Sequence, residues 1–459
     1  MKLCINLTVS FLLLMSVCYA DEKLPRTIPE PLTLNDALMF AEEPHPSLST
    51  ANLNLQTAMN IKREAETEND FNAYLEGSLS YVEPSPLLEN QANNDSRAGI
   101  VVSKTIYDFG RSEVSIHSAD FGIEAQEIER KKLIQQRRYD IMLRFFDVIL
   151  ADMTFYRYNE EMATAYISLD RLRDRLRLGQ TSDIEVMQQD VEYNRIRYLR
   201  IKSENGQRIT RAKLALAMGR PNELSATVTK PVLDKIKIKL PEIEDLQQLA
   251  LKNNYQLKAL NFKLLSARAN VELARNLDNP TLSLEAESYA YSRDLKSREE
   301  FQVGLVLRIP IFSGTKSDIA TAKALSLVHL IEADIESVKN KVFESILVQW
   351  LEFESLSGKL LQMKAQTDYR ELYLDRSRAL YEMEVKTDLG DAMVRVSEAE
   401  REYLQTQYQM MLALTKIELE LGQQLESIPK ATDASTSTTK ISLQENTEQN
   451  SLFEKDNTR

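Results

Sequence analysis

The sequence predicts a mainly α-helical protein with a transmembrane β-barrel portion. In this arrangement a long α-helical barrel continues a trimeric, twelve-stranded antiparallel barrel, to which each chain contributes four strands from two internal repeats. Three observations lead to this fold class: a long internal duplication, two long windows without proline, and four short segments of alternating polarity.

The duplication relates a segment from about 34 to 219 to a segment from about 243 to 422, roughly 205 positions further along. The matched residues include Asp36 with Asp245, Ala41 with Ala250, Asp183 with Asp388, and Gly219 with Gly422. A repeat of this length is a duplicated subdomain, because solenoid units span only about 20 to 50 residues. Two copies of one unit predict a pseudo-symmetric assembly.

The N-terminus predicts a secretory signal peptide over 1–20, with Lys2, an apolar run and a cleavage site after Ala20. The alternative is a lipoprotein whose mature chain begins at Cys18, which fits less well because Val17 is not small. Cys4 and Cys18 both precede the predicted cleavage site, so the mature chain has no cysteine and no disulfide.

The remaining boundaries follow from composition. Repeat one is predicted over 21–220, an inter-repeat linker over 221–242 and repeat two over 243–426. The segment 427–459 is rich in Ser, Thr, Asn, Gln, Glu and Lys, which predicts a disordered tail.

Long helices are predicted where proline is absent, between Pro86 and Pro221 and between Pro310 and Pro429. Each repeat reads as one shorter helix, two strands and two long helices. The predicted ranges are 34–68, 72–82, 97–106, 112–177 and 183–218, then 243–276, 281–291, 301–310, 315–382 and 388–425. A helix over 112–177 would be about 100 Å long, which implies a coiled-coil-like bundle.

The predicted strands alternate in polarity. Leu282, Leu284 and Ala286 fall opposite Ser283, Glu285 and Glu287, and the strand ends in Tyr289 and Tyr291. Segments of about ten residues with one apolar face and an aromatic end are typical of transmembrane barrel strands. From the strands alone, an ordinary antiparallel sheet with one buried face is the better fit, because the barrel signal of a single strand is weak. The polar linkers 83–96 and 292–300 favour the barrel, because they would form solvent loops on one side.

Four strands are too few to close a barrel, since the smallest barrels have about eight. Unpaired strand edges cannot face lipid, because each unsatisfied backbone group there costs several kcal/mol. If the strands lie in a membrane, the chain must oligomerise, and three chains would supply twelve strands. The long helices would then extend the barrel as a hollow bundle.

Several ordered motifs, each occurring once per repeat or joining two helices, resemble the outer-membrane efflux proteins typified by TolC. They are LTLNDAL with the following P-x-L, the strand-end pair TIYDFGR and PIFSGTK, the helix-turn-helix RLGQTSDIEVMQQ, and LALAMGRP. The resemblance covers about 32–425. It implies a homotrimeric duct in the outer membrane with a periplasmic helical extension, contacting outer-membrane lipid. The implied partners are a periplasmic adaptor (membrane fusion) protein and an inner-membrane transporter, in an efflux or type I secretion system.

The resemblance also implies where a periplasmic gate would lie. The family's gating tyrosine falls on Tyr381, its basic partner on Lys386, and the acidic residue that pairs with them on Glu185. The family's inner acidic ring falls on Gly390 and Met393, with Asp388 and Asp391 nearby. Asp388 equally fits a helix cap, and both interpretations stay open.

The other conspicuous residues predict structure rather than chemistry. Gly110 and Gly314 follow the strands and predict tight strand-to-helix turns. The basic run from Arg130 to Arg138 predicts a solvated helix face. The three histidines are dispersed, and HExxH, CxxC, P-loop and GxSxG patterns are absent, so the sequence predicts no enzyme, metal site or cofactor.

The net charge of −12 and pI of about 5.1 argue against a nucleic-acid partner. The competing prediction is a soluble periplasmic coiled-coil scaffold or adaptor protein, which would explain the helices and the charge but leave the four alternating strands without a role. The sequence does not indicate the exported cargo.

Overall fold

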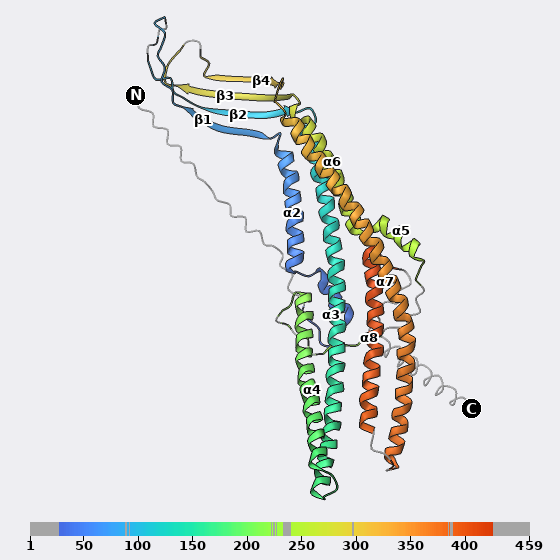
Figure 1. Ribbon diagram of the computed structural model, residues 1–459. Helices are drawn as coiled ribbons and strands as arrows, with labels where there is room; N and C mark the ends of the chain where they lie inside the picture. The colour runs from blue at the N-terminus through green and yellow to red at the C-terminus, as the bar shows by residue number, and fades with distance from the viewer. Residues whose placement is uncertain are drawn as a thin grey trace, which may run out of the picture.

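The computed structural model describes residues 27–425, apart from 88, 89, 91, 222, 224, 226, 233–239, 296, 297, 384 and 386–388. The predicted signal peptide and the predicted tail lie outside the described residues. The described chain is mostly helical with one small antiparallel sheet, which confirms the predicted fold class as far as a single chain can express it. The sheet lies at one end of a long layer of helices (Figure 1).

Apart from the two short 3-10 helices, η1 and η2, the same order of helices and strands occurs twice along the chain. The first half comprises α1 (Leu34–Met39), η1 (Phe40–Glu42), α2 (Pro46–Thr67), β1 (Phe71–Ser78), β2 (Arg97–Tyr107), α3 (Arg111–Arg177) and α4 (Asp183–Met218). The second comprises α5 (Ile243–Asn253), α6 (Tyr255–Arg275), η2 (Asn276–Asp278), β3 (Thr281–Tyr291), β4 (Phe301–Arg308), α7 (Lys316–Glu382) and α8 (Leu389–Leu421). Helices α3 and α7 have 67 residues each, about 100 Å of helix.

The first helix of each repeat is interrupted, so the single helices predicted over 34–68 and 243–276 are wrong. In repeat one the residue before Pro46 is forced out of the helical region, and His45 is extended at φ −150° and ψ 147°. In repeat two Asn254 caps a new helix, and its side chain accepts hydrogen bonds from the backbone nitrogens of Gln256 at 2.9 Å and Leu257 at 3.1 Å.

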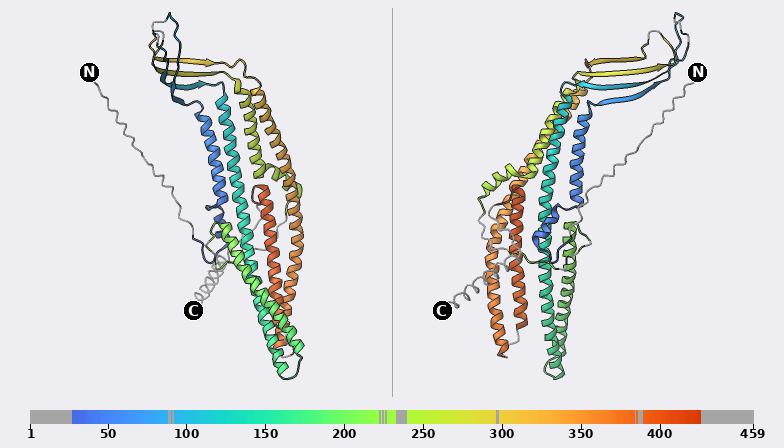
Figure 2. Two further views of the ribbon diagram at one scale, coloured as in Figure 1. Left: turned by 60° about the vertical axis from the view of Figure 1, so that its left-hand side comes forward. Right: turned by 180° about the vertical axis from the view of Figure 1, so that it is seen from behind.

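The helices form one layer whose two long members run its full length (Figures 1 and 2). In the half nearer the sheet, α2 packs on α3, α3 on α6 and α6 on α7. In the far half, α4 packs on α3, α3 on α8 and α8 on α7. Helices α4 and α7 therefore flank the layer in its far half. No helix in the described part of the chain carries an apolar stretch long enough to cross a membrane.

Two apolar cores lie midway along the layer, one per repeat. The first includes Phe40, Ile141, Phe145, Phe146 and Met218, and the second includes Leu246, Leu257, Ile346, Ile417 and Leu421. Burial of these side chains is the main term that holds α1 on α3 and α5 on α7.

Arg137 is buried beside the first core, which contradicts the predicted solvated basic face at this residue. Its side chain is only 6% exposed. Nε donates to the Ala41 carbonyl at 2.9 Å and Nη2 to the Phe40 carbonyl at 3.0 Å. The guanidinium thus donates to two carbonyl groups of η1, and the Phe40 carbonyl also accepts from the Glu43 nitrogen at 3.2 Å.

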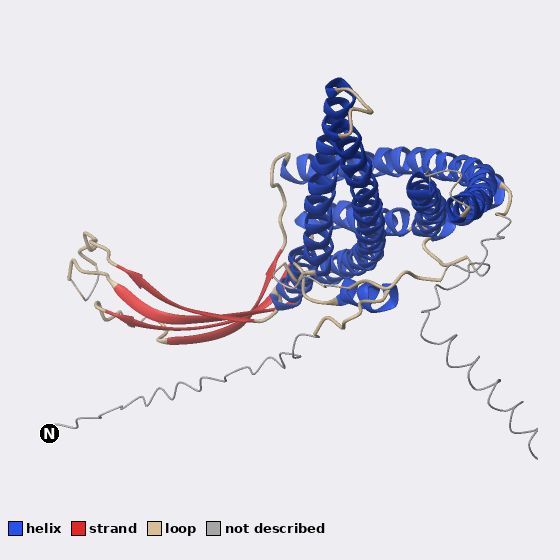
Figure 3. Cartoon of the chain, turned by 90° about the horizontal axis from the view of Figure 1, so that it is seen from below, coloured by secondary structure: helices blue, strands red, loops and turns tan. Residues whose placement is uncertain are grey.

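The four strands pair in the order β1-β2-β3-β4, all antiparallel, and the sheet curves away from the helices (Figure 3). Register separates its two faces. One face is apolar and exposed, with Leu75, Ile100, Phe301, Val303, Leu305 and Leu307. The other is polar, with Arg97 2.8 Å from Glu76 and Arg308 3.7 Å from Glu285.

On the polar face, Tyr289 of β3 lies across Gly99 of β2. A Cβ on Gly99 would overlap the Tyr289 ring. The tyrosine hydroxyl donates to Glu76 of β1 at 3.1 Å, so one side chain spans three strands. Gly99 is therefore required by a close approach rather than by a bend in the strand.

Candidate functional site

The candidate site is the end of the helical layer farthest from the sheet, where two helical hairpins end. In repeat one, α3 ends in a Schellman turn with Gly179 at φ 69°. The nitrogen of Gln180 donates to the Arg175 carbonyl at 2.8 Å, and that of Gly179 to the Leu176 carbonyl at 2.9 Å. We call residues 178–185 the repeat-one tip.

Glu185 belongs to the capping box that begins α4. Its backbone nitrogen donates to Ser182 Oγ at 3.3 Å, its carboxylate accepts from the Ser182 nitrogen at 3.5 Å, and Thr181 Oγ1 donates to the same carboxylate. The Thr181 hydrogen bond, followed by the Ser182 bond, holds the pKa of Glu185 below its usual value. Among the described residues, no hydrogen bond or ion pair joins Glu185 to Tyr381.

The repeat-two tip, residues 382–391, shares one backbone hydrogen bond with the repeat-one tip. The nitrogen of Val385 donates to the Leu380 carbonyl at 3.0 Å, as Gln180 does in repeat one. Tyr381, in the last turn of α7, is 46% exposed. Asp391 lies in the first turn of α8, 3.8 Å from Arg395. Lys386 and Asp388 lie outside the described residues, so the gate and cap interpretations of Asp388 stay predictions.

The two tips lie at different heights. Gly390, at the start of α8, contacts Thr164 of α3, and α3 continues for 13 residues, about 20 Å of helix, beyond Thr164. The repeat-one hairpin accordingly extends further from the sheet than the repeat-two hairpin (Figures 1 and 2). The structure therefore does not bring Glu185 and Tyr381 together within one chain.

Helices α3 and α8 form what we call the inter-repeat interface, which sequence reasoning missed. Phe146 stacks on Tyr408 with ring centroids 4.0 Å apart and planes at 2°. Nearer the tips, Arg157 donates to Glu398 at 3.2 Å. Ser397 then donates to Glu160 at 2.8 Å. The only sequence signal for this interface was the group of small and polar residues near the start of α8. Such residues indicate a close contact between helices but not which helix is contacted.

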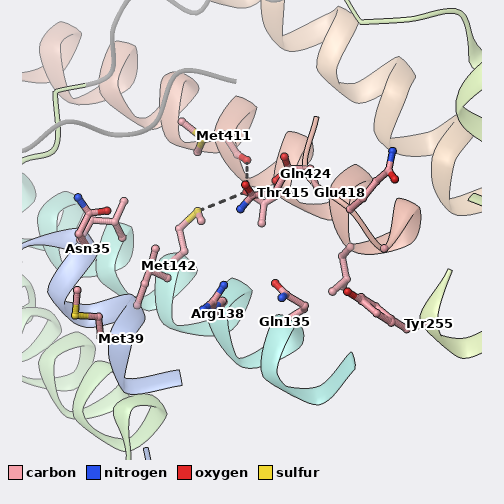
Figure 4. Close-up of a pocket in the computed structure, with 15 residues that line it drawn as sticks. Asn35, Met39, Gln135, Arg138, Met142, Tyr255, Met411, Thr415, Glu418 and Gln424 are labelled. Atoms are coloured by element: carbon pink, nitrogen blue, oxygen red, sulfur yellow. Dashed lines mark hydrogen bonds between the residues drawn. The ribbon is translucent and has the colours of Figure 1, made fainter. Parts of the chain in front are cut away.

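A cleft of about 620 Å³ opens between the repeats, beyond the Phe146–Tyr408 pair (Figure 4). Side chains from α1, α3 and α8 line it, including Met39, Arg138, Met142 and Met411, with Tyr255 of α6 at one end. Glu418 on its wall accepts from the Leu425 nitrogen at 2.9 Å, and burial raises the pKa of this carboxyl. The cleft therefore borders the first apolar core, to which Met142 and Met411 belong.

The strand-to-helix turns contain the predicted glycines. Gly110 has φ 88° and caps α3, and Gly314 has φ 70°, both in the left-handed region that favours glycine. A Cβ on either residue would meet no atom within 4 Å among the described residues, so backbone conformation alone calls for glycine.

Part of the second repeat matches a known protein family. Residues 246–423 match the model of the outer membrane efflux protein family. Protein CyaE of Bordetella pertussis is 21% identical over 220 residues, covering 47% of this chain and 46% of its own length. The chain thus spans about half the length of this curated relative.

Several solved structures resemble this protein over nearly the whole chain. The CmeC outer membrane channel of Campylobacter jejuni superposes with a TM-score of 0.70 at 13% identity, covering 89% of this chain and 88% of that one. A membrane protein of Pseudomonas aeruginosa gives 0.69 at 15%, with 87% and 92% covered. VceC of Vibrio cholerae gives 0.65 at 16%, with 86% and 97% covered. Residues 246–423 therefore match the outer membrane efflux protein family, and over its described length the chain has the fold of the TolC-like outer-membrane channels.

Proposed function

We propose that this protein is the outer-membrane channel component of a tripartite efflux or type I secretion system, a passive gated duct from the periplasm to the exterior. The observation that carries the proposal is the open four-stranded sheet with one exposed apolar face, attached to a layer of helices about 100 Å long. A sheet of this kind is incomplete as a single chain. Its exposed apolar face requires contact with lipid, and its two edge strands require partner strands.

Closure by copies of the same chain supplies those partners. Edge strands β1 and β4 carry exposed apolar residues such as Phe71, Leu75 and Leu305, and an unpaired edge cannot face lipid. A homotrimer would join β4 of one chain to β1 of the next, giving twelve strands. The polar face, with its Glu76–Arg97 and Glu285–Arg308 pairs, would line the interior.

The flanking helices support the same assembly. α4 exposes an apolar stripe that includes Ile184, Met187, Val191 and Tyr198, and α7 exposes Leu351, Leu361 and Leu372. Ile184, Met187 and Val191 are separated by three and then four residues, the spacing of a coiled-coil face. α4 of one protomer would pack against α7 of its neighbour, so that three layers close into a helical barrel.

The tips would form the periplasmic entrance and contact the adaptor, which links the duct to an inner-membrane transporter. Within the entrance, Tyr381 and Lys386 would hold the closed state. Because the tips differ in height, Glu185 would act mainly by fixing the repeat-one turn. Asp388 and Asp391 would place negative charge near the pore and favour cations.

The alternative, a soluble periplasmic scaffold, is distinguished by one experiment. The purified protein is reconstituted into planar bilayers, and single-channel conductance is compared between wild type and Tyr381→Phe combined with Lys386→Ala. The duct predicts a heat-sensitive trimer in the membrane fraction, with small conductance that grows in the double variant. An unchanged conductance would remove the gate assignment but keep the duct. A protein that stays soluble without detergent and inserts no channels would support the scaffold.

A further inference from the structure

Among the strand residues that the structure describes, Lys104 is the one charged residue on the apolar face of the sheet. The other charged side chains of the strands belong to the polar face, because the register alternates the two faces. They are Glu76, Arg97, Glu285, Glu287 and Arg308. A cation on the lipid face of a barrel is most destabilising at the middle of the bilayer and least near its surfaces. The position of Lys104 along the strand therefore decides what this residue can do.

Lys104 lies at the end of the sheet that adjoins the helices. It pairs in register with Phe71, the first residue of β1, and β2 ends three residues later at Tyr107. At about 3.4 Å per residue, Lys104 is roughly 10 Å from that end, measured along the strand. The same ends of β1 and β2 lead to α2 and α3 (Figure 1). In the proposed duct, this level is nearer the periplasmic surface of the membrane than its middle.

Aromatic side chains gather at the same level, as they do at both edges of the apolar band of a transmembrane barrel. The Nζ atom of Lys104 lies 4.5 Å from the centroid of the Phe71 ring, and Phe71 is 68% exposed. Tyr107 and Phe109 are also exposed, and their ring centroids are 4.7 Å apart. The ammonium group thus lies over an aromatic face, a contact that leaves its other side open to an anion.

The protein itself offers Lys104 no anionic partner in the part of the chain that the structure describes. Arg97 and Arg308 of the polar face lie beside carboxylates, whereas no described residue forms an ion pair or hydrogen bond with the Lys104 ammonium group. Closure of the proposed trimer would not supply one from the neighbouring strand. On this face the described residues of β4, the strand that would join β1, are apolar: Phe301, Val303, Leu305 and Leu307.

We propose that Lys104 and Phe71 bind the phosphate group of a phospholipid in the periplasmic leaflet of the outer membrane. This inference rests on the proposed channel function. The ammonium group pairs with the phosphodiester, and the acyl chains run along the exposed Ile100 and Leu75, which lie further from the helices on the same face. The site fixes the height of the sheet in the membrane, because a shift that carried Lys104 toward the middle of the bilayer would bury its charge.

The test measures the lipid that the purified, delipidated protein retains in detergent. Dioleoylphosphatidylglycerol is added, and bound lipid is counted by native mass spectrometry. Wild type and Lys104→Arg should retain it, and Lys104→Gln should retain severalfold less. Arg308→Gln is the matched control, because it removes a cation from the opposite face of the same sheet, and it should retain as much as wild type.

Two further probes identify the group that is recognised. Dioleoylglycerol has the same chains without a phosphate, so wild type and Lys104→Gln should bind it equally weakly. Inorganic phosphate, at matched ionic strength, should displace no more phosphatidylglycerol than chloride does, because it lacks the chains that contact the apolar face. Strong retention of dioleoylglycerol by both proteins would overturn the phosphate assignment. Displacement by inorganic phosphate would assign the site to a free ion instead of a lipid.

A second readout reports the depth of the site. Trp350 is the single tryptophan and lies beside the second apolar core, so Phe71→Trp adds one emitter at the sheet. In phosphatidylglycerol vesicles, the fluorescence that remains after subtracting wild type should be quenched more by lipids brominated next to the headgroup than by lipids brominated near the chain ends. The reverse order would place the site near the middle of the bilayer and refute it.

The outcomes separate the two proposals. If wild type requires detergent and retains phosphatidylglycerol, but Lys104→Gln retains as much, the lipid site at Lys104 is refuted and the duct stands. If wild type stays soluble without detergent, retains no lipid and shows no quenching in Phe71→Trp, the channel function fails together with the site.

Discussion

Three glycines that end helices offer a graded test of how the repeats are packed. Gly179, Gly219 and Gly422 follow α3, α4 and α8 with φ of 69°, 80° and 63°. A Cβ on Gly179 would stand in open space among the described residues, and one on Gly219 would lie 2.9 Å from the Pro44 carbonyl oxygen. On Gly422 it would overlap the Asn253 carbonyl, well under 3.0 Å away.

The expected magnitudes follow from two separate terms. Left-handed backbone costs a residue with a Cβ about 1–2 kcal/mol, and this term applies to all three positions. Overlap with packed atoms adds about 1–3 kcal/mol. Gly179→Ala should therefore lower stability by about 1–2 kcal/mol, and Gly422→Ala by about 2–5 kcal/mol. Gly219→Ala should fall between them.

The assay is thermal unfolding of the purified protein, followed by far-ultraviolet circular dichroism. Gly110→Ala, at φ 88° and also in open space among the described residues, is a second control for backbone conformation alone. The order of midpoints should be Gly179→Ala and Gly110→Ala highest, then Gly219→Ala, then Gly422→Ala. If Gly422→Ala unfolds no earlier than the controls, the close packing of α8 on the α5–α6 junction is not a stabilising contact.

Three further perturbations test residues in or beside the first apolar core. Burial, and secondarily the charge of Arg137, lower the pKa of His45 below its usual value of 6.5. The unfolded chain therefore binds a proton at His45 more readily than the folded chain does. The contribution of neutral His45 to the unfolding free energy is complete above pH 6.5 and declines as the pH falls below it. His45→Asn, which keeps a capping side chain, should flatten that decline in unfolding measured against pH. Tyr408, 1% exposed, has a buried hydroxyl without a hydrogen-bond partner among the described residues, so Tyr408→Phe should raise the unfolding free energy by about 1 kcal/mol. Arg137→Ala should lower the unfolding free energy by about 3 kcal/mol, whereas Arg130→Ala, which removes a half-buried side chain with one hydrogen bond to Asn52, should lower it by about 1 kcal/mol.

Sequence reasoning reached the fold because the determining signals are local. Proline positions, alternating polarity and the duplication between Asp36 and Asp245 place the long helices and strands. It missed the break at Asn254, because no proline marks it and an asparagine cap looks like any polar helix residue. It also placed Arg137 on the surface, since its partners are carbonyl groups about 96 positions earlier in the chain.

The candidate site was less predictable, for a related reason. The resemblance could name Tyr381 and Glu185, but not the difference in height between the two tips, which depends on how α3 and α8 align. Nor could it reveal Thr164 as the neighbour of Gly390, because a glycine carries no side chain whose chemistry indicates a partner. Contacts between repeats are fixed by tertiary packing, which a single sequence does not encode in short motifs.

The Tyr289 side chain that crosses Gly99 to reach Glu76 has a consequence for how the protein is made. In the single chain, β1 is an edge strand that pairs, among the described residues, with β2 alone. A one-residue slip of β1 would carry Glu76 away from the tyrosine hydroxyl and turn Leu75 to the polar face. In the proposed trimer, a newly folded chain would therefore present its neighbours with an edge strand whose register is already fixed, so that the subunits would only need to join matching strands.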